Sequence, residues 1–197
     1  LGRLIGPRLK RKNEMYRENL SRAFPLKNED EIQQLVLKSW FSAGRVLAEY
    51  PHISAILESK DRQRVHIELS EEFRASLQDQ RPTVFVGAHT SNWEMVMPAL
   101  SRLGVPLAAL YSPPTNPLLN QMLYNSRKEM NCELVARDSA ARDMMRHLKK
   151  GRSTGLIVDR RIDGGPDVSF FGLPKPSSLL PAKLALKYNI NLVPGRV

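Results

Sequence analysis

The chain has 197 residues, enough for one α/β domain with its own hydrophobic core and a helical appendage. Its hydrophobic content of 42% is ordinary for a globular protein, and no stretch reaches the roughly 18–20 consecutive apolar residues that cross a bilayer. The lone cysteine, Cys132, excludes an internal disulfide and a thiolate metal cluster, and the four histidines lack the spacing of a metal site. We therefore expect no metal and no organic cofactor.

The formal net charge of +10 is unevenly spread along the chain. Half of this charge falls in residues 1–22, which contain seven basic and two acidic residues and so have a net charge of +5. Such a stretch suits an anionic membrane surface, a phosphorylated lipid, an acidic carrier protein or a nucleic acid. A solvated basic helix is the alternative interpretation. The basic residues are Arg3, Arg8, Lys10, Arg11, Lys12, Arg17 and Arg22, against Glu14 and Glu18.

The first part of the chain, residues 1–76, has helical patterns. In residues 31–50 apolar side chains recur at three- and four-residue steps, which predicts an amphipathic helix. We expect Asn28 to cap this helix, with Glu31 completing a capping box, and Pro51 to end it. Residues 1–76 are thus expected to form a basic helical segment.

From residue 82 on, short apolar runs alternate with helical patterns. This alternation predicts an α/β domain over residues 82–197, with a largely parallel sheet flanked by helices. Because the sequence opens with Leu1 rather than Met and stops directly after a strand-like run, we expect a piece of a longer protein that lacks both ends. Strands are expected at 83–88, 106–111, 133–136, 154–158 and 190–194, an edge strand at 168–171, and helices at 93–103, 118–130, 140–150 (closed by Gly151) and 179–188.

The most informative segment for function is residues 84–94 (VFVGAHTSNWE), where a hydrophobic strand leads to a histidine and then to a helix. On one continuous helix His89 and Glu94 would lie about 140° apart, so a turn between them is needed for the carboxylate to reach the imidazole. Ser91 or Asn92 can cap a helix that starts after such a turn. A carboxylate on one ring nitrogen leaves the other nitrogen to take a proton from a substrate hydroxyl.

Other interpretations of this segment remain open. Ser91 and Glu94 have the spacing of a capping box, so Glu94 can simply close the helix, and a histidine at a strand end can be a satisfied core residue. Cys132 lies outside any nucleophile signature. We therefore favour direct activation of an acceptor hydroxyl, without a covalent acyl-enzyme.

An ordered set of motifs resembles the late acyltransferases of lipid A biosynthesis, within the glycerolipid acyltransferase superfamily. The resemblance covers nearly the whole chain and begins with the H-x4-E block of His89 and Glu94. It continues through residues 19–25 (NLSRAFP), 110–117 (LYSPPTNP), 135–137 (VAR), 148–151 (LKKG), 156–159 (LIVD) and 170–174 (FFGLP).

This resemblance implies an acyltransferase at the cytoplasmic face of the inner membrane, with residues 1–76 as its membrane-proximal segment. It would move a fatty acyl chain from acyl carrier protein to a hydroxyl of a phosphorylated lipid A precursor, with His89 as base and Glu94 as its orienting partner. Substrate-binding roles would fall to Asn116, Arg127, Arg137 and Asp159. Arg127 can equally form a surface ion pair, and Asp159 can cap a turn.

Two positions depart from the family pattern. Ser112 stands where the family has arginine, and Arg160 follows Asp159 where the family has glutamine, so the substrate contacts expected at both positions change. The Phe170–Phe171 pair is expected to serve burial rather than to line an acyl-chain site. Alternative functions are transfer to a lysophospholipid or another lipid acceptor and, more remotely, a basic nucleic-acid-binding module. For the latter the sequence lacks a fingerprint, and no nucleic-acid partner is expected.

Overall fold

The structure is a computed structural model that describes residues 2–58, 65–113, 115, 117–118, 120–121, 124–125 and 132–197. Its contacts group the chain into two compact units: Leu1–Tyr50 with Ser169–Pro174, and Pro51–Val168 with Lys175–Val197. The domain division expected from the sequence, 1–76 and 82–197, stays a prediction. Within the described residues, no helix combines the length and the apolar character that crossing a membrane requires.

The amphipathic helix expected in the first unit is present. It is α3, and its capping box is complete: the Glu31 backbone N–H donates to Asn28 Oδ1 at 2.9 Å, and the Asn28 N–H donates to Glu31 Oε2 at 3.0 Å. Trp40 of α3 donates its indole N–H to Asn13 Oδ1 at 2.6 Å and packs against the Tyr16 ring, so α2 is fixed on α3. The helices of this unit are α1 (Gly2–Ile5), the 3-10 turn η1 (Gly6–Arg8), α2 (Lys10–Ala23) and α3 (Glu29–Glu49).

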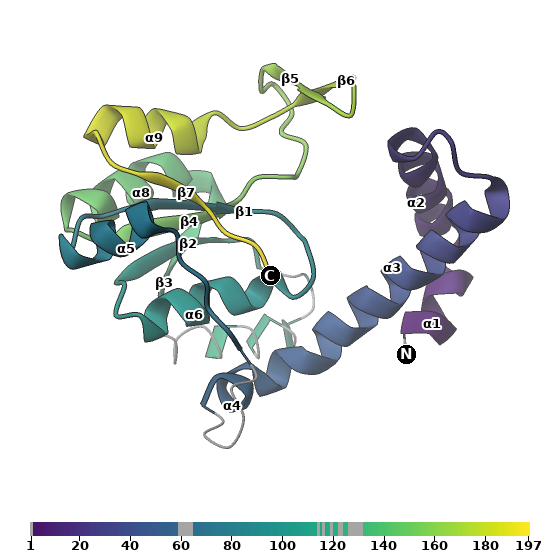
Figure 1. Cartoon of the computed structure of the whole chain (residues 1–197), viewed down its shortest axis with the longest axis horizontal. Helices are drawn as coiled ribbons and strands as arrows, with labels where there is room; N and C mark the ends of the chain where they lie inside the picture. Colours follow the sequence, from purple (N-terminus) through teal and green to yellow (C-terminus); the bar gives the residue numbers. More distant parts are fainter. Residues whose placement is uncertain are drawn as a thin grey trace. The chain divides into compact units, whose positions relative to one another are not determined.

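The second unit is built on a five-stranded sheet in the order β3-β2-β4-β1-β7, and every neighbouring pair is parallel (Figure 1). The α/β class with a largely parallel sheet is therefore confirmed. The strands are β1 (Val84–Gly87), β2 (Leu107–Tyr111), β3 (Cys132–Ala136), β4 (Ser153–Ile157) and β7 (Leu192–Pro194). The helical segments are η2 (Tyr50–His52), α4 (Ile53–Glu58), α5 (Glu71–Gln78), η3 (Trp93–Met95), α6 (Val96–Arg102), η4 (Arg137–Ser139), α8 (Ala140–Lys149) and α9 (Leu180–Tyr188).

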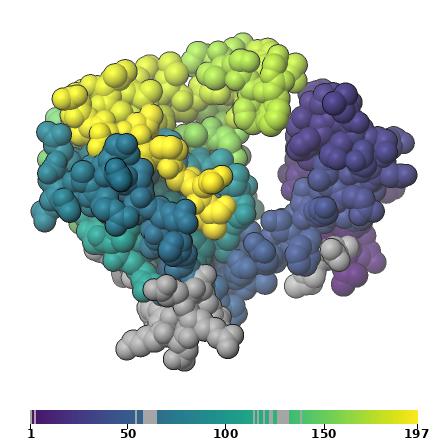
Figure 2. All heavy atoms as spheres, viewed as in Figure 1, coloured from purple at the N-terminus to yellow at the C-terminus, as the bar shows by residue number. Residues whose placement is uncertain are grey.

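The edge strand expected at 168–171 is instead part of a separate hairpin, formed by β5 (Asp167–Phe170) and β6 (Leu173–Pro176). Phe171 and Gly172 make its two-residue turn, both with positive φ (50° and 74°), as hairpin turns of type I′ require. The expectation that Phe170 and Phe171 serve burial is wrong, because these side chains are 52% and 62% exposed. Figure 2 shows this yellow-green part of the chain at the surface.

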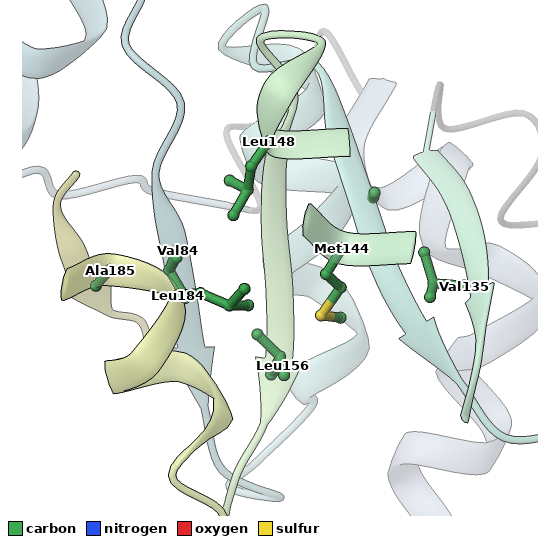
Figure 3. Packing of buried hydrophobic residues seen from close by; sticks show 8 residues of the cluster. Val84, Val135, Met144, Leu148, Leu156, Leu184 and Ala185 are labelled. Carbon is green, nitrogen blue, oxygen red and sulfur yellow. The ribbon is translucent and has the colours of Figure 1, made fainter. Parts of the chain in front are cut away.

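Helices cover both faces of the sheet because its strands are apolar on both sides, as buried parallel strands are. Val84 joins a cluster with Met144 and Leu148 of α8 and with Leu184 of α9 (Figure 3). The next residue, Phe85, points to the opposite face and meets Phe73 of α5 edge-on, at 5.3 Å between ring centroids. The sheet is thus packed between two layers of helices.

Helix α8 ends as the sequence predicts. Gly151, with φ of +77°, donates its N–H to the Leu148 carbonyl, and the Arg152 N–H donates to the His147 carbonyl, the two bonds of a Schellman motif. Most of the helix expected at 118–130 falls outside the described residues.

Candidate active site

Strands β1 and β4 are parallel neighbours that end at the same edge of the sheet. Their register places Gly87 opposite Ile157, and the Val158 N–H donates to the Gly87 carbonyl at 2.9 Å. His89 follows Gly87 by two residues. Asp159 follows Ile157 by the same step, so the two polar residues stand side by side at the carboxyl edge, where open α/β sheets bind ligands.

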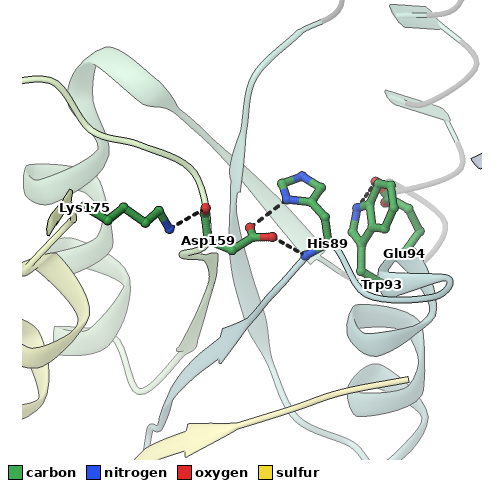
Figure 4. Close-up of polar contacts among 5 residues, drawn as sticks. All are labelled: His89, Trp93, Glu94, Asp159 and Lys175. Atoms are coloured by element: carbon green, nitrogen blue, oxygen red, sulfur yellow. Dashed lines mark hydrogen bonds and ion pairs between the residues drawn. The ribbon is translucent and has the colours of Figure 1, made fainter. Parts of the chain in front are cut away.

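The Asp159 carboxylate binds His89 through both of its oxygens. Oδ1 lies 2.7 Å from the imidazole Nδ1, and Oδ2 accepts the His89 backbone N–H at 2.9 Å (Figure 4). Because an ionised carboxylate can only accept hydrogen bonds, Nδ1 carries the proton in the neutral form of the ring, and Nε2 then has the free lone pair. The His89 and Asp159 side chains are 38% and 32% exposed, so a substrate can reach the ring from solvent.

The electrostatics of the pair favour an ionised Asp159. Partial burial acts to raise the pKa of this carboxyl group, but hydrogen bonds from the His89 backbone and ring, together with the charge of the imidazolium, lower it by more. The net pKa therefore lies below the ordinary aspartate value. The Lys175 ammonium donates to the Asp159 backbone carbonyl at 2.6 Å, which fixes the backbone that carries this carboxylate.

The segment after His89 turns before it becomes helical, as the sequence predicts. The Thr90 N–H donates to the Ala88 carbonyl at 2.7 Å, and Ser91 has a positive φ of 44°. The 3-10 turn η3 then leads into α6. Asn92 precedes η3, but its side chain makes no capping hydrogen bond there.

Trp93 contacts both His89 and Glu94 (Figure 4). Its ring meets the imidazole edge-on, with 4.7 Å between centroids. Its indole N–H donates to Glu94 Oε1 at 3.2 Å. The carboxylate that the structure places on the His89 ring is that of Asp159, and the direct pairing of His89 with Glu94 stays a prediction.

The other expected site residues are more widely placed. Arg137 is exposed directly after β3, and β2 and β4 separate β3 from β1, so it stands about 14 Å along the sheet edge from the strand of His89. Arg160 and Ser112, which depart from the family pattern, are both exposed. Asn116 and Arg127 lie outside the described residues.

Sequence reasoning missed two features of the site. One is the contact between Asp159 and His89, since the expected role of Asp159 was to hold substrate or cap a turn. The sequence does show that His89 and Asp159 each follow a short apolar strand. Only the order of the strands in the sheet shows that these two residues meet. The other is Lys175, which sits in the β5–β6 region and has no motif of its own. In the described part of the chain, no set of three or more histidine, cysteine or acidic side chains is placed to hold a metal ion.

The fold and the site together define an α/β domain with a histidine bound to a carboxylate at the carboxyl edge of a parallel sheet. The family model described as bacterial lipid A biosynthesis acyltransferase matches residues 1–197, so the chain belongs to that family of acyltransferases. It is 24% identical over 160 residues to the lipid A biosynthesis palmitoleoyltransferase of Escherichia coli (strain K12), covering 81% of this chain and 52% of that protein. The lipid A biosynthesis acyltransferase of Shigella flexneri matches to the same extent. The chain thus spans about half the length of the curated relatives it matches.

Proposed function

We propose that this protein transfers a fatty acyl chain from the thioester of acyl carrier protein to a hydroxyl of a lipid A precursor. The observation that carries the proposal is the hydrogen bond between His89 Nδ1 and Asp159 Oδ1, at 2.7 Å. It fixes the tautomer in which Nε2 is the basic nitrogen. Membership of the lipid A acyltransferase family supports acyl transfer as the reaction.

The reaction follows from that tautomer. His89 Nε2 takes the proton of the acceptor hydroxyl while the hydroxyl oxygen forms a bond to the thioester carbonyl carbon. The tetrahedral intermediate then expels the thiolate of the carrier, which receives the proton from the imidazolium. The ionised Asp159 stabilises the imidazolium between these steps. Cys132 is buried in the sheet core, which agrees with direct transfer rather than an acyl-cysteine intermediate.

The proposal also assigns places to the remaining residues. Glu94 would keep its role as an orienting partner of His89, acting on the ring directly or through Trp93, which contacts both. Arg127 and Arg137 would bind the phosphates of the acceptor, since guanidinium groups suit phosphate, and Asn116 would contact substrate. The reaction would take place at the cytoplasmic face of the inner membrane, with the basic residues of 1–22 against anionic lipid.

Acyl transfer measured with purified protein, acyl carrier protein loaded with a fatty acid, and a lipid A precursor tests this function. His89→Ala should lower turnover by about 10²- to 10⁴-fold, the usual contribution of a general base. His66→Ala is the matched control, because His66 is exposed and 3.6 Å from Glu68, in a contact of its own. Near-wild-type turnover by His89→Ala would overturn the mechanism. Transfer to a lysophospholipid but not to the lipid A precursor would instead change the acceptor.

A further inference from the structure

A row of cations lies on the outer face of α8, away from the sheet. Met144 and Leu148 point inward to the core, whereas Arg142, Arg146 and Lys149 are exposed. These three follow one another at steps of four and three residues, so they form one stripe along the helix, about 10 Å long.

Helix α9 adds a fourth cation and an apolar floor. Lys187 and Tyr188 of α9, with Met145 of α8, complete the lining of a shallow depression of about 350 Å³ that the stripe borders. The Lys187 ammonium lies 3.6 Å from the Met145 sulfur, which joins the two helices across the depression. Asp143 pairs with Arg146 at 2.9 Å, so the cations outnumber the carboxylate in contact with them.

Tyr188, one of the residues that line the depression, also carries a polar atom without a partner among the described residues. The Tyr188 hydroxyl is buried and has no hydrogen-bond partner among the described residues. A buried hydroxyl without a partner costs free energy, which a polar group of a bound molecule would recover. This observation is independent of the charge pattern and concerns a residue of the same lining.

We infer that this α8–α9 surface docks an acidic protein helix. The cations are strung along about 10 Å of helix rather than gathered on one point, so they match a row of carboxylates better than a single phosphate. An apolar centre with a charged rim is also the usual anatomy of a protein interface, and methionine is frequent on surfaces that accept helices. The identity of the partner rests on the proposed function: the acidic helix is that of the acyl carrier protein, the donor of the acyl chain.

The test compares two variants, in each of which two basic residues are replaced by glutamate, so that both have the same net charge. Arg142→Glu with Lys187→Glu alters both sides of the depression. Arg74→Glu with Arg81→Glu alters one exposed arginine within α5 and one after it, and α5 packs against the other face of the sheet. Binding of acyl carrier protein is measured by fluorescence anisotropy at several salt concentrations. The first variant should bind roughly tenfold more weakly or worse and lose most of the salt dependence, because attraction becomes repulsion. The second should bind as the wild type does.

Kinetics separate docking from chemistry. With the carrier-bound donor, the Arg142/Lys187 variant should show a raised KM and a nearly unchanged kcat. With a small acyl-pantetheine thioester, which lacks the protein, it should match the wild type. Tyr188→Phe keeps the shape of the depression and removes only the hydroxyl, so it should weaken carrier binding a few-fold without loss of thermal stability.

Several results would overturn the inference: no binding of the carrier by the wild type, equal losses in both charge variants, or unchanged carrier binding in the first variant. Reduced binding to vesicles of anionic lipid with carrier binding intact would assign the surface to a membrane instead. Failure of the proposed function gives a different result. If the wild type binds the carrier but transfers no acyl chain from either donor, the proposed function is wrong and the docking inference is still supported.

Discussion

His89 and Asp159 meet because the two strands that precede them are in register, with Gly87 opposite Ile157. Each residue is two positions beyond its strand, so the same parallel pairing that builds the sheet also sets the 2.7 Å contact between the imidazole and the carboxylate. The second bond, from the His89 backbone to Asp159 Oδ2, fixes the carboxylate relative to the chain as well as to the ring. The geometry of this pair therefore depends on the pairing of β1 with β4 in the sheet.

This arrangement predicts different effects for the two carboxylates near His89. Asp159→Asn replaces an acceptor by an amide that can also donate, so the favoured ring tautomer is lost and kcat should fall by about 10²- to 10⁴-fold. Glu94→Gln retains an oxygen that can accept the Trp93 indole N–H, so its loss should be smaller. Turnover of both variants is measured in the acyl-transfer assay, with circular dichroism as the check on folding. A severe loss in Glu94→Gln beside an active Asp159→Asn would favour the His89–Glu94 pairing.

A second prediction concerns stability in acid. The pKa of Asp159 is lowered in the folded protein, so its stabilising contribution is complete above the unfolded-state pKa of about 3.9 and is lost as the pH falls through the folded value. Asp159→Asn has no such titration. The difference in unfolding free energy between wild type and variant should therefore be larger at about pH 5 than below about pH 4, where it shrinks as the carboxyl group takes up a proton. Urea denaturation from pH 3 to 6 measures it, and a difference that does not change across this range would contradict the lowered pKa.

A third prediction concerns the basic stretch of the first unit. Arg8, Lys10, Arg11 and Lys12 are exposed, and Leu4 and Ile5 nearby are 66% and 52% exposed, so charge and apolar surface occur together. Replacing the four cations by glutamine should weaken binding to anionic vesicles, by about 1 kcal/mol for each residue near the surface. Sedimentation with anionic and with neutral vesicles measures this change. If the stretch is only a solvated helix, partition at low salt will not change.

Local features of the fold were predictable from the sequence, whereas the contacts between strands were not. The Asn28 capping box and the Gly151 helix end follow from short patterns whose geometry is set within a few residues. The pairing of His89 with Asp159 spans 70 positions and depends on the strand order β4-β1, which no local pattern encodes. Burial of the Phe170–Phe171 pair is a wrong expectation for a related reason: hydrophobicity argues for burial, but the chain leaves the sheet there and forms an exposed hairpin.

A last prediction tests the local structure of the first unit. The Asn28 side chain caps α3, and the Asn28 backbone N–H donates to the Glu31 carboxylate. Asn28→Ala removes the side-chain oxygen that accepts the first-turn N–H of Glu31. The change should lower the stability of this helical unit by about 1 kcal/mol, within a usual range of about 0.5–2. Asn28→Ser supplies another good cap and should lie close to the wild type. Thermal unfolding followed at the helical circular dichroism band measures both, and equal melting of Asn28→Ala and wild type would show that packing of Trp40 against α2, rather than the cap, determines the stability of α3.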